Sequence, residues 1–317
     1  MRVVRFHRYG GPEVLRIDET PRPVPGEGEL LIEVSLAGVT LPVVRLTHGD
    51  GTGGGVPLPY APGGEVVGRV RAVGPGVTGW RVGQRAAGLA FSGAYAEFVA
   101  VPAAMLAAVP DGVADAAALG LVRGGQVALG ALRAGRLEPG ESVLVTGAAG
   151  GVGHLAVQLA RALGAGRVVA ATGTPGKADF LRGLGVDELV DYGDPDGDWG
   201  DPVDVVLDGV GGDVQERGLR ALRSLGRLVD YNGVGGPIDS NQLRMRGQSL
   251  VGFAMAHLVG QRPEVYERHR RELWQFAIDG AVRPAVHATL PLDGAAEAHR
   301  IVESRANLGK VVLDLTR

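Results

Sequence analysis

Residues 142–164 read SVLVTGAAGGVGHLAVQLARALG, and this stretch is the strongest indication of the fold. It opens with a short β-branched run, continues through a glycine cluster, and ends with apolar residues at helical spacing from Val152 onward. Glycines let a backbone approach phosphate groups, and a helix N-terminus presents free N–H groups and the positive end of a dipole. The spacing Ala148-x-Gly150-x-x-Gly153 is a weak signal alone among 53 glycines, but its place between strand and helix predicts a dinucleotide-binding turn.

Composition narrows the class of protein. A chain of 317 residues suggests about two domains, and 45% hydrophobic with 21% charged residues is typical of globular proteins. The absence of cysteine excludes disulfides, thiolate metal sites and cysteine nucleophiles. A net charge of −3 gives no basic field for nucleic acid or an anionic membrane. The first residues lack the apolar core of a signal peptide, and no run is long enough to span a membrane, so we expect a cytoplasmic protein.

Two regions follow each other along the chain. About the first 100 residues contain short β-branched runs separated by proline and glycine, which predicts a β-barrel-type domain. From about residue 114 strands alternate with helices, which predicts a doubly wound parallel sheet. The expected strands are 142–146, 167–171, 188–190, 203–207, 227–231 and 249–253, and the expected helices are 114–134, 175–184, 214–222 and 264–279. The tail strand 310–315 should rejoin the first domain, which gives domains at 1–118 with 283–317 and at 119–282.

The residues at the end of the second expected strand indicate which nicotinamide cofactor the chain binds. A unit specific for NAD usually carries Asp or Glu there to bind the ribose hydroxyls. Here Thr174 and Lys177 follow the strand and no acid does. A hydroxyl and a cation can bind a 2′-phosphate, so we expect NADPH rather than NADH. Thr174 is equally suited to cap the next helix while Lys177 is solvated, and both roles are compatible.

With these residues in view, the chain resembles the medium-chain dehydrogenase/reductase superfamily, in its zinc-free quinone oxidoreductase (zeta-crystallin-like) and enoyl reductase branch. The resemblance runs nearly end to end. It rests on Gly10 to Leu15 (GGPEVL), Pro62 to Gly68 (PGGEVVG), Gly74 to Val77 (GPGV), Gly83 to Arg85 (GQR), Glu138 to Glu141 (EPGE), the GAAGGVG turn and Gly309 to Leu313 (GKVVL). It implies a GroES-like β-barrel-type domain beside a Rossmann domain.

The resemblance also implies particular cofactor contacts. The pyrophosphate would lie on Gly150, Gly151 and Val152, and the 2′-phosphate on Lys177 and Tyr192, beside Thr174. The remaining implied contacts are Asn232 and Gly233 near the ribose, the backbone of Phe253 and Met255 at the nicotinamide carboxamide, and Asn307 and Lys310 from the tail.

This chain lacks residues that the zinc-dependent branch uses to bind zinc, and it differs from the usual quinone oxidoreductase pattern in the substrate pocket. That branch carries Cys within the segment that here reads Ala37 to Thr40, and His before the Glu of its Gly-His-Glu turn, where this chain has Gly64 before Glu65. Catalytic zinc needs three protein ligands, so we expect no metal. The pocket also departs, with Thr40 in place of the usual Asn and RGGQV at 123–127 in place of a threonine segment. The candidate donors to a developing oxyanion are Thr40, Arg123 and Gln126.

These observations predict an NADPH-dependent reductase that passes hydride to a quinone or an electron-poor C=C without a metal. The alternatives are an enoyl or polyketide-intermediate reductase of one pathway, and a regulatory protein that binds NADPH without catalysis. The expected partners are a small-molecule substrate and a second copy of the chain, joined through the apolar edge strand 249–253. A loop at 234–247 covering that edge in a monomer is the other possibility.

Overall fold

The computed structural model describes residues 1–50, 55–231 and 235–316. The chain forms two compact units, one of residues 1–123 with 284–317 and one of residues 124–283. We call these the N-terminal unit and the central unit, and each is described by itself. Among the described residues, no helix has both the length and the apolar character that crossing a membrane requires.

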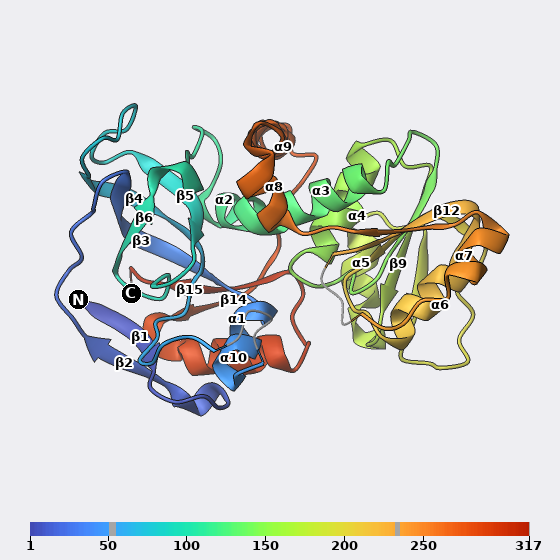
Figure 1. Cartoon of the computed structure of the whole chain (residues 1–317), viewed down its shortest axis with the longest axis horizontal. Coiled ribbons are helices and arrows are strands. Elements are labelled where there is room, and N and C mark those ends of the chain that lie inside the picture. The colour runs from blue at the N-terminus through green and yellow to red at the C-terminus, as the bar shows by residue number, and fades with distance from the viewer. Residues whose placement is uncertain (51–54, 232–234, 317) are drawn as a thin grey trace. The chain divides into compact units, whose positions relative to one another are not determined.

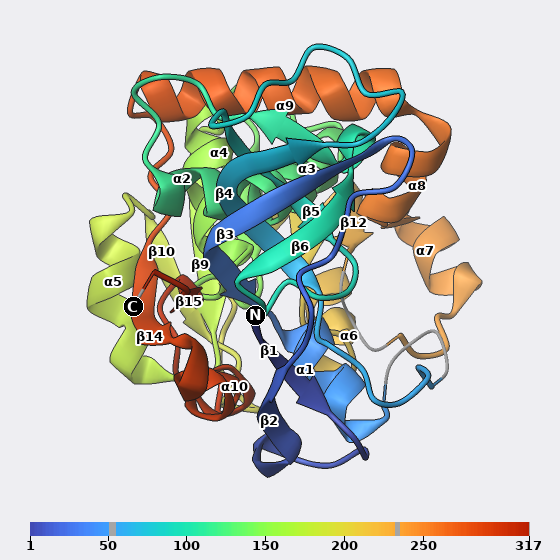
Figure 2. The same cartoon turned by 90° about the vertical axis from the view of Figure 1, so that its left-hand side faces the viewer.

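The N-terminal unit is built on a seven-stranded sheet in which β3 lies at the centre (Figures 1 and 2). Its strands are β3 (Glu29–Val39), β4 (Gly64–Val73), β5 (Arg85–Ala90), β6 (Phe98–Pro102), β7 (Leu106–Ala108), β14 (Val286–Pro291) and β15 (Lys310–Asp314). The path runs β14-β15-β3-β4-β5-β7, and β6 pairs with β3. A separate antiparallel pair consists of β1 (Arg2–Phe6) and β2 (Leu15–Glu19).

The tail strand returns to this unit as the sequence predicts. All five residues of β15 are buried, which a half-exposed edge strand would not allow. The strand runs antiparallel to β3, with Val311 opposite Val39, and parallel to β14. The N-terminal unit is therefore built from two separate stretches of the chain.

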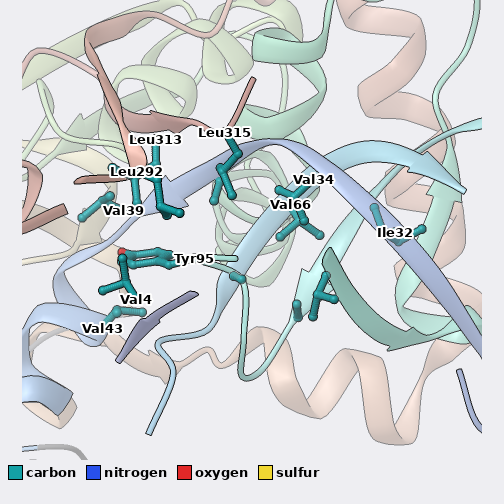
Figure 3. Close-up of a cluster of buried hydrophobic side chains, with 14 of the residues drawn as sticks. Val4, Ile32, Val34, Val39, Val43, Val66, Tyr95, Leu292, Leu313 and Leu315 are labelled. Carbon is teal, nitrogen blue, oxygen red and sulfur yellow. The ribbon is translucent and has the colours of Figure 1, made fainter. Parts of the chain in front are cut away.

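Helices α1 (Leu41–His48) and α10 (Ala295–Glu303) close the core of the N-terminal unit. The ring of Tyr95 is fully buried there, and Figure 3 shows it among Val4, Val43 and Leu292. Its hydroxyl lies 3.3 Å from Nε2 of His299 on α10. The first chain segment of the unit ends near α2 (Asp115–Gly120), which continues into a π-helical turn at Leu121–Gly125.

The central unit contains the predicted doubly wound parallel sheet. Its order is β10-β9-β8-β11-β12-β13, so the order reverses between the first strand, β8, and the fourth, β11. This is the strand order of Rossmann domains, which bind dinucleotides where the order reverses. The strands are β8 (Ser142–Val145), β9 (Arg167–Thr172), β10 (Glu188–Asp191), β11 (Val203–Asp208), β12 (Leu222–Asp230) and β13 (Ser249–Gly252).

Helices pack on both faces of this sheet (Figure 1). Gly218 of α6 lies against Val206 and Leu228, whereas Gly135, just after α3, lies against Val205 and Val229. Successive strand residues point to opposite faces, so α3 and α6 cover different sides. The helices of the unit are α3 (Gln126–Ala134), α4 (Gly153–Ala162), α5 (Ala178–Gly183), α6 (Asp213–Ala221), α7 (Ser240–Arg246), α8 (Met255–Gln261) and α9 (Pro263–Ile278).

Candidate functional site

The turn between β8 and α4 is shaped for a phosphate group. A Cβ on Gly153 would lie 2.3 Å from the carbonyl oxygen of Gly147 and 2.7 Å from Cα of Ala148, so only glycine fits where the helix crosses the turn. Within the described residues, the backbone N–H groups of Gly151 and Val152 make no hydrogen bond. Free N–H groups at a helix start are the donors that an anion uses, so the turn fits a pyrophosphate.

A buried carboxylate connects two neighbouring strand ends by hydrogen bonds at the point where the strand order reverses. Asp208, the last residue of β11, is fully buried and accepts a 2.8 Å hydrogen bond from the hydroxyl of Thr146. The same carboxylate oxygen accepts the N–H groups of Val210 and Gly211 at 3.0 and 3.2 Å. The turn after β11 is thereby tied to the turn after β8. Sequence reasoning missed this role, although an acid that ends a buried strand was a visible signal.

The expected 2′-phosphate residues gather at the carboxyl ends of β9 and β10. The backbone N–H of Lys177 donates to the carbonyl of Thr174 at 3.2 Å, so one turn holds both side chains. Tyr192 follows β10, and a Cβ on Gly173 would lie 2.6 Å from its ring, so the ring covers the backbone just before Thr174. The structure brings the three predicted residues together, with Thr174 exposed and Lys177 half-buried.

The N-terminal unit holds a buried cluster of charges that sequence reasoning did not find. Glu65 on β4 is fully buried, and its carboxylate is hydrogen-bonded to the ammonium of Lys310, the first residue of β15. Its side chain lies across Gly38 of β3, where a Cβ would come within 2.6 Å of it. Glycine at position 38 is therefore what admits a glutamate side chain into this sheet.

Arg123 completes this cluster. Its Nη1 lies 4.0 Å from Oε2 of Glu65, and 29% of its side chain is exposed. Burial alone would raise the pKa of Glu65, but the charges of Lys310 and Arg123 outweigh it and hold that pKa below its usual value. Burial and then the charge of Glu65 raise the pKa of nearby Tyr95 well above its usual value. Glu65 is therefore ionised and Tyr95 neutral at physiological pH.

The other pocket candidates take different positions. Gln126 is fully buried in the central unit, where its amide donates to the carbonyl of Tyr266 on α9 at 3.1 Å. In this structure the amide N–H therefore joins two helices of the unit. Thr40 precedes α1, and its hydroxyl is buried without a hydrogen bond to any described residue. Of the three predicted donors, only Arg123 carries a charge and lies beside another charged group of the cluster.

The remaining predicted contacts are dispersed. The N–H of Phe253 donates to the carbonyl of Asp230 at 2.8 Å, and Met255 begins α8. The amide of Asn307 donates to the carbonyl of Gly309 at 2.7 Å. The ammonium of Lys310, expected at the cofactor, is engaged by Glu65 inside the N-terminal unit. Asn232 and Gly233 lie outside the described residues.

Among the residues that the structure describes, no group of side chains has the composition of a metal site. The chain has no cysteine, and no three His, Asp or Glu side chains of the described residues gather in a group that could hold a metal. Catalytic zinc uses three protein ligands and structural zinc uses four.

Comparisons with known proteins agree with this architecture. Residues 184–313 match the zinc-binding dehydrogenase family, and residues 26–111 match the alcohol dehydrogenase GroES-like domain. The chain is 32% identical to a probable quinone oxidoreductase of Schizosaccharomyces pombe, covering 98% of this chain and 96% of that protein. It is also 32% identical to a 2-haloacrylate reductase of a Burkholderia species, covering 97% of each. The structure of the Escherichia coli quinone oxidoreductase complexed with NADPH superimposes with a TM-score of 0.90 at 28% identity, covering 99% of this chain and all of that one.

Proposed function

The chain belongs to the quinone oxidoreductases of the medium-chain dehydrogenase/reductase family, and on that premise we propose that it reduces a quinone or an electron-poor C=C with NADPH. The central unit would bind the cofactor and the N-terminal unit would contribute groups that bind the acceptor. The observation that carries the proposal is the glycine turn, with its free N–H groups beside the cluster of Thr174, Lys177 and Tyr192.

When bound, NADPH supplies the hydride that the acceptor receives. The N–H groups of Gly151 and Val152 would hold its pyrophosphate at the start of α4. Lys177 would pair with the 2′-phosphate, and Thr174 would donate to it. The E. coli quinone oxidoreductase bound to NADPH supports this choice of cofactor.

On the acceptor side, the chain's task is to orient the reacting carbon and to stabilise the charge that develops on the acceptor oxygen. Arg123 and the buried hydroxyl of Thr40 are the groups suited to donate to that oxygen. The proton that completes the reduction would come from solvent. The relative named 2-haloacrylate reductase supports an activated C=C as one acceptor class.

The test of the reaction is steady oxidation of NADPH by the purified protein with a panel of quinones and enones. Turnover with at least one acceptor supports the proposal. Tight NADPH binding without turnover of any acceptor would instead favour a regulatory protein that has lost catalysis.

The test of the cofactor site is a titration with NADPH and NADH. We expect NADPH to bind at least about tenfold more tightly, a difference of roughly 1.4 kcal/mol, because one charge-assisted contact can supply it. Lys177→Ala should weaken NADPH and leave NADH nearly unchanged, whereas Arg182→Ala, on the exposed surface of α5, should change neither. Equal affinities in the unmodified protein contradict the assignment.

We also propose that two chains form a dimer through β13. This strand is the edge of its sheet, pairs only with β12 among the described residues, and exposes 37% of Leu250. An apolar edge strand is prone to pair with a second strand. Light scattering should give twice the chain mass of 32.7 kDa. Leu250→Asp should reduce it to one chain, and the same change at exposed Val82 of the N-terminal unit should not. A monomer from the start refutes the interface.

A further inference from the structure

The cluster of Glu65, Lys310 and Arg123 carries more positive than negative charge. Lys310 and Arg123 each contribute one positive charge, and Glu65 contributes the one negative charge. Glu65 and the side chain of Lys310 are 0% and 4% exposed, so solvent screens them weakly. The cluster reaches the surface at Arg123, so the excess positive charge can attract an anion there.

Arg123 retains donors for a ligand. Its guanidinium makes no hydrogen bond to any residue that the structure describes, and its nearest carboxylate oxygen is 4.0 Å away. That oxygen, Oε2 of Glu65, is buried and also lacks a hydrogen bond within the described residues. Glu65 therefore attracts Arg123 by charge without accepting a hydrogen bond from it. The N–H groups of the planar guanidinium stay available, and their geometry allows two parallel hydrogen bonds to a carboxylate.

The residue that follows Arg123 in the chain packs against the cofactor turn of the central unit. This residue, Gly124, is packed so closely that a Cβ there would lie 2.9 Å from the carbonyl oxygen of Gly151. Arg123 itself lies in the π-helical turn at Leu121–Gly125, a local geometry that is frequent at functional sites.

We propose that Arg123 binds a carboxylate on the hydride acceptor, so that the preferred acceptors are alkenes conjugated to a carboxylate. Glu65 and Lys310 are positioning residues, which fix the guanidinium and leave its charge uncompensated. This inference rests on the proposed reductase function and names the acceptor class for it.

The chemistry of such an acceptor needs this charge. Hydride forms a bond to the β-carbon, and the π electron pair moves toward the α-carbon and the carboxylate oxygens. The carboxylate then carries a second negative charge until a proton from water adds to the α-carbon. The acceptor gains two electrons, which the cofactor loses. A fixed guanidinium at the carboxylate stabilises both the ground-state charge and the added one, most strongly the second.

The experiment compares a 2-enoate with its uncharged amide, using the full chain with saturating NADPH. In Arg123→Gln, kcat/KM for the 2-enoate should fall about 30- to 100-fold, the size of a lost charge-assisted hydrogen bond. The amide should lose at least about threefold less, because its oxygen carries only the charge that develops during the reaction. Arg123→Lys should be intermediate, because it keeps the charge and loses the fork. Arg133→Gln, at an exposed position of α3, is the matched control and should change neither substrate.

Two binding measurements separate the possible failures. The saturated carboxylate should inhibit the unmodified protein and bind at least about tenfold more weakly to Arg123→Gln, while NADPH affinity stays unchanged. If Arg123→Gln weakens NADPH and affects both acceptors equally, Arg123 binds the cofactor diphosphate and the inference is wrong. Equal behaviour of the enoate and amide in both proteins also overturns it. If no acceptor is reduced but the saturated carboxylate still binds through Arg123, the anion site stands and the proposed reaction fails.

Discussion

Replacing Lys310 by methionine should destabilise the N-terminal unit and leave cofactor affinity unchanged. Glu65 is fully buried and hydrogen-bonded to Lys310, so the change leaves a buried carboxylate whose remaining cation, Arg123, is 4.0 Å away. Breaking a buried ion pair by removing one partner costs about 3–5 kcal/mol. Glu65→Met should cost a similar amount, because it strands an ammonium that is only 4% exposed.

The double variant is the sharper part of this prediction. Because an apolar pair of similar volume can replace a buried ion pair at little cost, Lys310→Met with Glu65→Met should lie within about 1–2 kcal/mol of the unmodified protein. The assay is urea unfolding followed by tryptophan fluorescence, since Trp80 packs against the core of this unit. Arg71→Met, which breaks the exposed pair with Glu33, is the control and should cost less than about 1 kcal/mol.

Two results would refute the reasoning. Single-variant costs that simply add in the double variant would mean that the two side chains are not energetically coupled. A Lys310→Met protein of normal stability with weakened NADPH binding would return Lys310 to the cofactor contact that the family resemblance implies.

Three further predictions concern the turn, the buried histidine and metal dependence. Gly153→Ala should weaken NADPH binding at least about tenfold in a fluorescence titration, because its Cβ would lie 2.3 Å from the Gly147 carbonyl, whereas Gly183→Ala, with open space around it, should not. Burial, with a smaller effect of the charge on His48, lowers the pKa of His299 to about 4, below its ordinary 6.5, so the unfolded chain takes up the proton first as the pH falls. Unfolding free energy should therefore drop by up to about 3 kcal/mol from this group between pH 7 and 4, and His299→Gln should flatten that part of the profile; parallel profiles would count against it. Exhaustive chelation should leave activity intact. Stoichiometric zinc in elemental analysis that is lost together with activity would contradict the prediction that the reaction needs no metal.

The central unit was predictable because its signals are local. Every strand of the parallel sheet except β10 is followed by a helix, and all six expected strands exist within a few residues. The boundaries that moved have local causes. β12 begins at Leu222 rather than 227, since the segment around Leu225, a residue with φ of 67°, continues the strand through what reads as a turn. The helix expected over 114–134 exists with a π-helical turn inserted at Leu121–Gly125.

The elements that were missed are short and stabilised by their surroundings. α1, α7, α8 and α10 have seven to nine residues each, below the length at which a helix is stable alone in water. α10 is held by burying Ala298 and Val302 in the core of the N-terminal unit, together with the contact between His299 and Tyr95. That burial depends on chain segments some 200 residues apart, so no local pattern shows it.

The charge cluster could not be predicted for the same reason, and this bears on how the resemblance is used. Glu65 and Lys310 are 245 positions apart and meet only because β4 and β15 flank β3 on opposite sides, with Gly38 leaving room between them. Motif matching assigns Lys310 to the cofactor by its place after Gly309, whereas the strand pairing gives its ammonium to Glu65. Lys310 fixes the buried carboxylate of Glu65, and that carboxylate in turn attracts the guanidinium of Arg123. The feature that distinguishes acceptors would then lie in a pairing of distant strands, although the feature that binds the cofactor is readable in a single stretch of sequence.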